Sequence, residues 1–157
     1  MGRKGWTFIE LIITIAILAV LASVVVPLSH MSVKRSKEVE LRRDLRMLRT
    51  AIDDYKRAWD EGRIIRKVDE SGYPEDLMVL VEGIEDAKSP ESDRRIRFLR
   101  RIPRDPMSQD IYSDPEETWG LRSYESDPDS PEEGDDVFDV YSRSEETAID
   151  GTLYSSW

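Results

Sequence analysis

Cysteine is absent from this 157-residue chain, and its one histidine is His30. The lack of cysteine excludes disulfide bonds and thiolate metal sites. The chain also lacks a nucleophile motif and a phosphate-binding loop, so we expect neither enzymatic activity nor a bound nucleotide. His30 follows the long apolar segment described below, and we interpret it as a polar interface residue and not as a catalytic base. The length fits one small domain, not two.

The charge of the chain is acidic overall and unevenly distributed. The formal net charge is −10, which argues against nucleic acid as a partner. Residues 34–67 contain 12 Lys or Arg against 7 Asp or Glu, whereas residues 101–157 contain 4 against 16. One part of the chain is therefore basic, and the C-terminal part is strongly acidic.

An uncharged apolar segment occupies residues 11–28 (LIITIAILAVLASVVVPL). As a helix, these residues would span about 27 Å, close to the thickness of a membrane hydrocarbon core. A secretory signal peptide is one alternative, with Ala22 and Ser23 as small residues for its cleavage site, and a plain membrane anchor is another. Glu10 favours a third interpretation, because a carboxylate at the edge of such a helix is costly in lipid and usually serves a function.

The residues around Glu10 form a recognisable motif. A short basic leader, residues 1–4, precedes Gly5-Trp6-Thr7-Phe8-Ile9-Glu10. This run resembles the processing motif of type IV pilins and pseudopilins, whose common form is G-F-T-L-I-E. Trp6 replaces the family's Phe, Phe8 replaces its Leu, and Pro27 falls where the family places a helix-kinking proline.

The resemblance implies how the N-terminal segment is used. A prepilin peptidase would cut between Gly5 and Trp6 on the cytoplasmic side, and the new amine of Trp6 would be methylated. Glu10 would pair with the Trp6 amine of a neighbouring copy, so that assembly relieves the cost of burying its charge. Orientation rests on the family, because Lys34, Arg35 and Lys37 alone would favour the opposite topology. The implied organisation is a leader at 1–5, a transmembrane and assembly helix at 6–29, and a periplasmic pilin-like domain at 30–157.

A single apolar stripe extends the helical pattern beyond the membrane segment. Its residues are spaced by three and four positions, which predicts a helix from about residue 7 to residue 60, packed on the core of its own domain. The stripe consists of Leu41, Leu45, Leu48, Ile52, Tyr55 and Trp59. A short helix is expected at 75–82, loops at 84–97 and 125–136, a loop or edge at 98–102, and strands at 119–124 and 137–142. We therefore expect an α+β pilin-like fold with a small antiparallel sheet.

Short motifs in the second half resemble the major pseudopilin of type II secretion systems. They are Tyr73-Pro74, Ile102-Pro103-Arg104-Asp105-Pro106, Trp119-Gly120, Asp139-Val140-Tyr141-Ser142 and the closing Trp157. Two features depart from the family: residues 107–118 separate the Asp-Pro from the Trp-Gly, and the stretch after Ser142 is short.

This second resemblance implies a structural subunit that polymerises into the periplasmic pseudopilus and drives export of folded proteins. The implied partners are copies of the chain, minor pseudopilins, the inner-membrane assembly platform and the prepilin peptidase. A cytoplasmic ATPase would supply the energy.

The resemblance also implies that calcium holds the C-terminal loop, because the family lacks disulfides there. Calcium prefers six to eight oxygen ligands. The candidates are Asp150, Ser142 and Ser144, whereas we interpret Glu145 and Glu146 as ordinary solvated acids. Residues 127–136 do not form an EF-hand loop, since the required glycine would fall at Glu132.

Three other functions stay open. A surface type IV pilin is disfavoured by the absence of cysteine, since many such pilins close their C-terminal region with a disulfide. A minor pseudopilin at the fibre tip and a monomeric membrane-anchored binding protein are further alternatives. For a fibre, the charge asymmetry predicts that the acidic face of one copy lies beside the basic helix of the next, with Arg42, Arg43, Arg46 and Arg49 as candidates.

Overall fold

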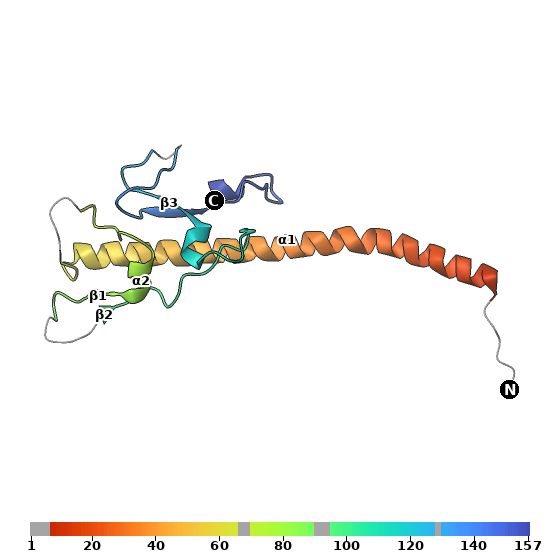
Figure 1. Ribbon diagram of the computed structural model, residues 1–157, viewed down its shortest axis with the longest axis horizontal. Coiled ribbons are helices and arrows are strands. Elements are labelled where there is room, and N and C mark those ends of the chain that lie inside the picture. The colour runs from red at the N-terminus through yellow and green to blue at the C-terminus, as the bar shows by residue number, and fades with distance from the viewer. Residues whose placement is uncertain (1–6, 66–69, 90–94, 128–129) are drawn as a thin grey trace, which may run out of the picture. The chain divides into compact units, whose positions relative to one another are not determined.

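The computed structural model describes residues 7–65, 70–89, 95–127 and 130–157, without the side chains of residues 24–27. The chain divides into two compact units, Met1–Ser36 and Lys37–Trp157. Helix α1 (Phe8–Asp60) contributes residues to both units (Figure 1). Its bounds confirm the helix predicted from about residue 7 to residue 60.

In the first unit, the apolar side chains of α1 lie exposed. Phe8, Ile9 and Leu18 have exposed fractions of 79%, 67% and 63%. An 18-residue window of this segment has a mean hydropathy of 2.9, so the helix is long and apolar enough to cross a membrane. The backbone of Pro27 lies within α1.

The core of the second unit is built on the predicted stripe of α1. Leu41, Leu48 and Ile52 are at most 1% exposed, and Trp59 packs partly buried against the same core. Trp119 and Tyr154 are fully buried in that core, with Leu80 and Val140. Burial of a large apolar side chain stabilises a fold by about 1.5–3 kcal/mol, so this stripe holds the later elements onto α1.

Helix α2 (Met78–Glu82) is shorter than the predicted 75–82. Gly83 ends it with a φ of 79°, a backbone conformation that favours glycine. A Cβ at Gly83 would lie 2.6 Å from the carbonyl oxygen of Ile96. Directly after Gly83, strand β1 (Ile84–Glu85) pairs antiparallel with β2 (Arg95–Ile96), and each strand has two residues. The loop predicted over 84–97 is therefore wrong at its ends, because two residues are too few to show strand alternation.

Strands β3 (Trp119–Arg122) and β4 (Asp139–Ser142) form a second antiparallel pair, with Trp119 opposite Ser142 and Arg122 opposite Asp139. Both lie within the predicted strands and are shorter. Gly120 faces Tyr141, whose ring would lie 2.4 Å from a Cβ at this position. This lack of space explains why the Trp-Gly motif has a glycine here. The predicted α+β layout, a long helix with a small antiparallel sheet, is confirmed. Short 3-10 helices, η1 (Pro115–Thr118) and η2 (Tyr154–Ser156), complete the described elements.

Candidate functional site

The predicted processing residues, Gly5 and Trp6, lie outside the described residues. Cleavage between them and methylation of Trp6 therefore stay predictions. Pro27 lies in α1 by its backbone, and its side chain is outside the described part, so its role in assembly also stays a prediction.

Glu10 lies in the first turn of α1 and takes part in a reciprocal cap. The Thr7 amide donates to Glu10 Oε2 at 3.5 Å, and the Glu10 amide donates to Thr7 Oγ1 at 3.3 Å. This pair is a capping box, a motif that the Thr-x-x-Glu spacing signals in the sequence but that we did not predict from it. The bond to the carboxylate is at the outer limit of hydrogen-bond length. Among the described residues, the Thr7 amide is thus a weak hydrogen-bond partner of the Glu10 carboxylate.

A buried carboxylate on α1 anchors the C-terminal segment. Glu38 is 8% exposed. It accepts hydrogen bonds from the Tyr154 hydroxyl at 2.9 Å and from the Ile149 amide at 2.8 Å. Burial and the neighbouring Glu38 raise the pKa of Tyr154, so the phenol stays a neutral donor. Glu38 was not predicted from the sequence, although it lies three residues before Leu41 and thus on the core stripe.

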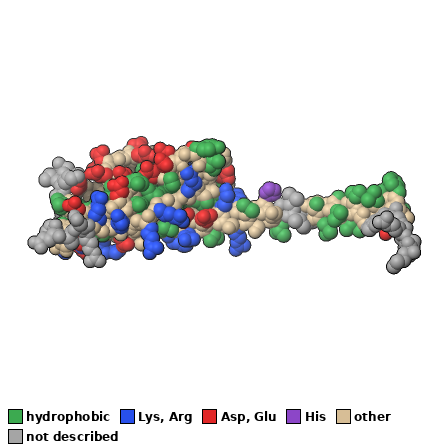
Figure 2. Space-filling view, turned by 60° about the horizontal axis from the view of Figure 1, so that its bottom comes forward, with side chains coloured by type: hydrophobic (Ala, Val, Ile, Leu, Met, Phe, Trp, Pro, Cys, Tyr) green, Lys and Arg blue, Asp and Glu red, His purple; other side chains and the backbone are tan. Residues whose placement is uncertain are grey.

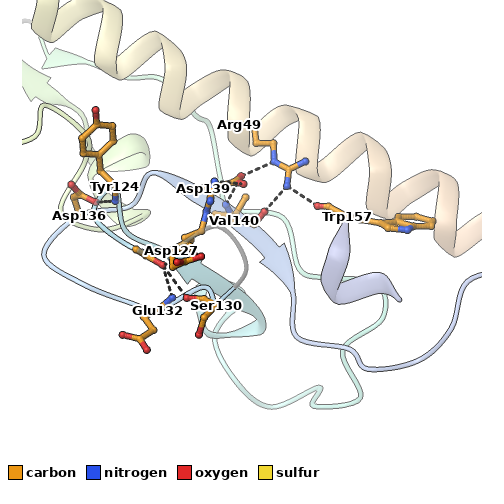
Figure 3. Close-up of polar contacts among 11 residues, drawn as sticks. Arg49, Tyr124, Asp127, Ser130, Glu132, Asp136, Asp139, Val140 and Trp157 are labelled. Carbon is orange, nitrogen blue, oxygen red and sulfur yellow. Dashed lines mark hydrogen bonds and ion pairs between the residues drawn. The ribbon is translucent and has the colours of Figure 1, made fainter. Parts of the chain in front are cut away.

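Arg49 joins α1 to β4 and to the C-terminus (Figure 3). Its Nε donates to Asp139 Oδ1 at 2.7 Å. Its terminal nitrogen donates to the carbonyl oxygens of Val140 at 3.0 Å and Trp157 at 2.6 Å. Arg122 contacts the other oxygen of Asp139 at 3.4 Å. Arg49 was a candidate for contacts between copies, but the structure commits its guanidinium to contacts within the chain.

The metal candidate Asp150 has both carboxylate oxygens occupied. Oδ1 accepts from the Thr152 amide at 3.0 Å and the Thr152 hydroxyl at 2.7 Å, and Oδ2 pairs with Arg42 at 3.2 Å. The bonds from Thr152, with Arg42 nearby, hold the pKa of Asp150 below its usual range. The Arg42 guanidinium also lies 4.0 Å from the centre of the Trp157 ring. Arg42, like Arg49, is therefore used within the chain.

The two serine candidates, Ser142 and Ser144, form hydrogen bonds with residues other than Asp150. Ser142 is fully buried, and its hydroxyl donates to Asp105 Oδ2 at 2.6 Å. The Ser144 hydroxyl accepts from the Glu146 amide at 3.4 Å. Within the described residues, no group of three or more His, Asp or Glu is placed to hold a metal. A guanidinium paired with the one candidate carboxylate does not fit a calcium cage as the side chains now lie.

The calcium expectation stays a prediction, and melting of the detergent-solubilised full chain tests it. If Asp150 is a ligand, a chelator lowers the melting temperature, because an ion that binds only the folded state stabilises it. Asp150→Ala should then remove the response. Arg42→Ala is the matched control, since it breaks the same ion pair and leaves the carboxylate. A melting temperature indifferent to calcium and chelator would mean that Arg42, Glu38 and their partners hold the segment without metal.

Asp105 and Arg104 organise the segment that departs from the family pattern. The Asp105 amide donates to Thr118 Oγ1 at 3.1 Å, and Asp105 Oδ1 accepts from the Met107 amide at 2.7 Å. Arg104 donates to the carbonyl oxygens of Asp110, at 2.7 Å, and Ser113. Burial raises the pKa of Asp105, and its bond to Ser142 works against that rise. The inserted residues therefore form a hydrogen-bonded loop whose flanks stay close, since the Trp119 indole donates to the carbonyl oxygen of Pro103 at 2.8 Å.

These features define a class of protein: a pilin-like subunit, with an apolar helix that carries Glu10 and a small α+β domain built on the same helix. Comparison with known proteins finds relatives that share one name. The type II secretion system core protein G of Klebsiella pneumoniae is 29% identical over 140 residues, 86% of this chain and 92% of that protein. Those of Aeromonas hydrophila and Dickeya chrysanthemi are 30% and 29% identical over 107 residues, 66% of this chain and 67% and 63% of the relatives. The chain belongs to the family of type II secretion system core proteins G, the major pseudopilins.

Two further comparisons give nothing. No family model matches the chain, and no solved structure matches it.

Proposed function

We propose that this chain is the main structural subunit of a type II secretion pseudopilus, the fibre whose growth exports folded proteins across the outer membrane. The observation that carries the proposal is the family match, which spans 92% of the relative from Klebsiella pneumoniae. The exposed apolar part of α1 supports it, because such a surface requires lipid or neighbouring helices around it.

The chain would be anchored once in the bacterial inner membrane, with its C-terminal domain in the periplasm. Its partners would be further copies of itself, minor pseudopilins, the inner-membrane assembly platform and the prepilin peptidase. The capping box supports an assembly role for Glu10, because the weak bond to Thr7 leaves the carboxylate available to a neighbouring amine.

Deletion of the gene in the bacterium that encodes it tests the function. We expect the proteins normally released to accumulate in the periplasm, and a plasmid copy of the gene to restore their release. Measurement of one secreted enzyme and of one periplasmic marker in the medium separates export from lysis. Normal export together with loss of fibres sheared from the cell surface would instead support a surface type IV pilus.

A further inference from the structure

The second unit carries an open groove with an acidic rim. Its volume is about 1440 Å³, larger than the roughly 300–1,000 Å³ typical of small-molecule sites. Tyr73 and Tyr124 line it and stack with ring centroids 5.6 Å apart. Nine carboxylates and one cation, Arg95, line it, and five of these carboxylates come from the end of α2, from β1 and from the β3–β4 loop: Glu82, Glu85, Glu125, Glu132 and Asp135. None of these five forms an ion pair within the described residues.

Backbone and side-chain bonds hold the rim in place (Figure 3). The Glu132 amide donates to Ser126 Oγ at 2.8 Å, and the Tyr124 amide donates to Asp136 Oδ1 at 2.8 Å. The Ser123 amide donates to the Glu132 carbonyl oxygen at 3.0 Å. A rim that is ordered before binding loses less conformational entropy when a partner docks.

The solvent-facing side of α1 in the same unit is basic. We call Val39, Arg43, Arg46 and Thr50 the Arg43 face; their spacing of four, three and four places them opposite the core stripe. All four are exposed, and Val39 is 64% exposed. Arg43 and Arg46 form no ion pair within the described part of the chain, unlike Arg42 and Arg49.

We propose that the Arg43 face of one copy docks into the acidic groove of a second copy. Arginine suits such a groove, because its guanidinium binds carboxylates in a fork and stacks on aromatic rings. Val39 adds an apolar contact beside the two cations. Figure 2 shows Asp and Glu gathered along one side of the second unit and Lys and Arg along the other. This inference names an interface for the assembly proposed above and rests on that function.

Within one copy, the Arg43 face and the acidic groove lie too far apart to contact each other. Tyr55 lines the groove and lies twelve residues after Arg43 on the same helix, which is about 18 Å along its axis. Tyr55 also belongs to the core stripe, whereas Arg43 lies on the opposite side. A contact between different surfaces of two identical chains is heterologous, so each added copy presents a free groove and a free Arg43 face. Such contacts extend into an open helical fibre unless they close into a ring.

Disulfide cross-linking tests the contact directly, because the chain has no cysteine of its own. We would introduce Arg46→Cys and Glu132→Cys together in the full chain and oxidise cells that make the fibre. We expect a ladder of linked dimers, trimers and larger species, and no ladder from either single substitution. Arg46→Cys with Glu145→Cys is the matched control, since Glu145 is an exposed acid that lines a different hollow. No ladder from the first pair, or an equal ladder from the control, would overturn the proposal.

Charge reversal gives a second, independent measurement. Arg43→Glu with Arg46→Glu should lower fibre yield roughly fivefold or more, because each added copy loses its contacts and gains repulsion. Glu132→Lys with Asp135→Lys should do the same, and all four changes together should restore part of the yield. Lys88→Glu with Arg100→Glu alters the net charge equally at two exposed positions outside α1, and it should leave the yield unchanged. Absence of recovery in the fourfold variant counts against the pairing.

Failure of this interface and failure of the proposed function give different results. Wild-type fibres and normal export without a cross-linked ladder would remove the interface and leave the function. A ladder in cells where deletion of the gene leaves export intact would support the interface and remove the secretion function.

Discussion

Glu10→Ala should abolish fibre formation while the chain still enters the membrane. A carboxylate in an apolar helix costs a few kcal/mol in lipid, so its removal favours insertion. Assembly should fail because the amine of Trp6 in the neighbouring copy then lacks its acceptor, and an unpaired buried charge is strongly destabilising. Immunoblots of membrane fractions and of sheared fibres measure the two quantities separately.

Thr7→Ala separates pairing between copies from the capping of α1. In the structure, Glu10 exchanges two hydrogen bonds with Thr7, so its loss also removes a cap. Thr7→Ala removes the same cap, at a typical cost of about 1 kcal/mol, and leaves the carboxylate in place. We expect this variant to assemble nearly as well as the wild type. If Thr7→Ala is as defective as Glu10→Ala, or if Glu10→Ala forms fibres normally, the charge-pairing role is wrong.

The long helix and its core face could be predicted from sequence because their signal is local and repeated. The apolar residues from Leu41 to Trp59 repeat the helical spacing of three and four positions several times, and each repeat places an apolar side chain on the same face of the helix. The cap formed by Thr7 and Glu10 is equally local, and its Thr-x-x-Glu spacing is a sequence signal that we did not use. Strands β3 and β4 alternate over four residues each, which was enough to find them but too little to fix their ends.

The contacts that hold the C-terminal segment depend on residues that are distant in the sequence. Glu38 meets Tyr154 across 116 positions, and Arg49 meets Trp157 across 108. A local pattern can place Arg42 and Arg49 on the surface side of α1, as it does Arg43 and Arg46. It cannot say which of the four arginines a later loop will cover. Similarly, β1 and β2 have two residues each, too few for a pattern, and Gly83 before β1 lets the backbone of Ile96 approach because it has no Cβ.

Gly5→Leu should leave the leader attached. The resemblance to prepilins implies a peptidase that accepts only a small residue before the scissile bond, so a leucine side chain would block cleavage after residue 5. Mass spectrometry of membrane-extracted protein should find wild-type chains that begin at N-methylated Trp6 and Gly5→Leu chains that begin at Met1. Gly5→Ala is the matched control, since alanine is small, and we expect it to be cut. Wild-type chains that keep Met1 in cells with the peptidase would contradict the prediction.

Uncut chains should also fail to assemble, for the same electrostatic reason as Glu10→Ala. While the leader is attached, the nitrogen of Trp6 is an uncharged amide, and it cannot neutralise Glu10 of a neighbouring copy. The basic leader, residues 1–4, would also have to enter the space where helices meet. Gly5→Leu and Glu10→Ala should therefore both lose fibres, yet only Gly5→Leu should retain Met1. Processing and charge pairing are thus separable steps, and a cut, methylated Glu10→Ala chain that still fails to assemble would isolate the second.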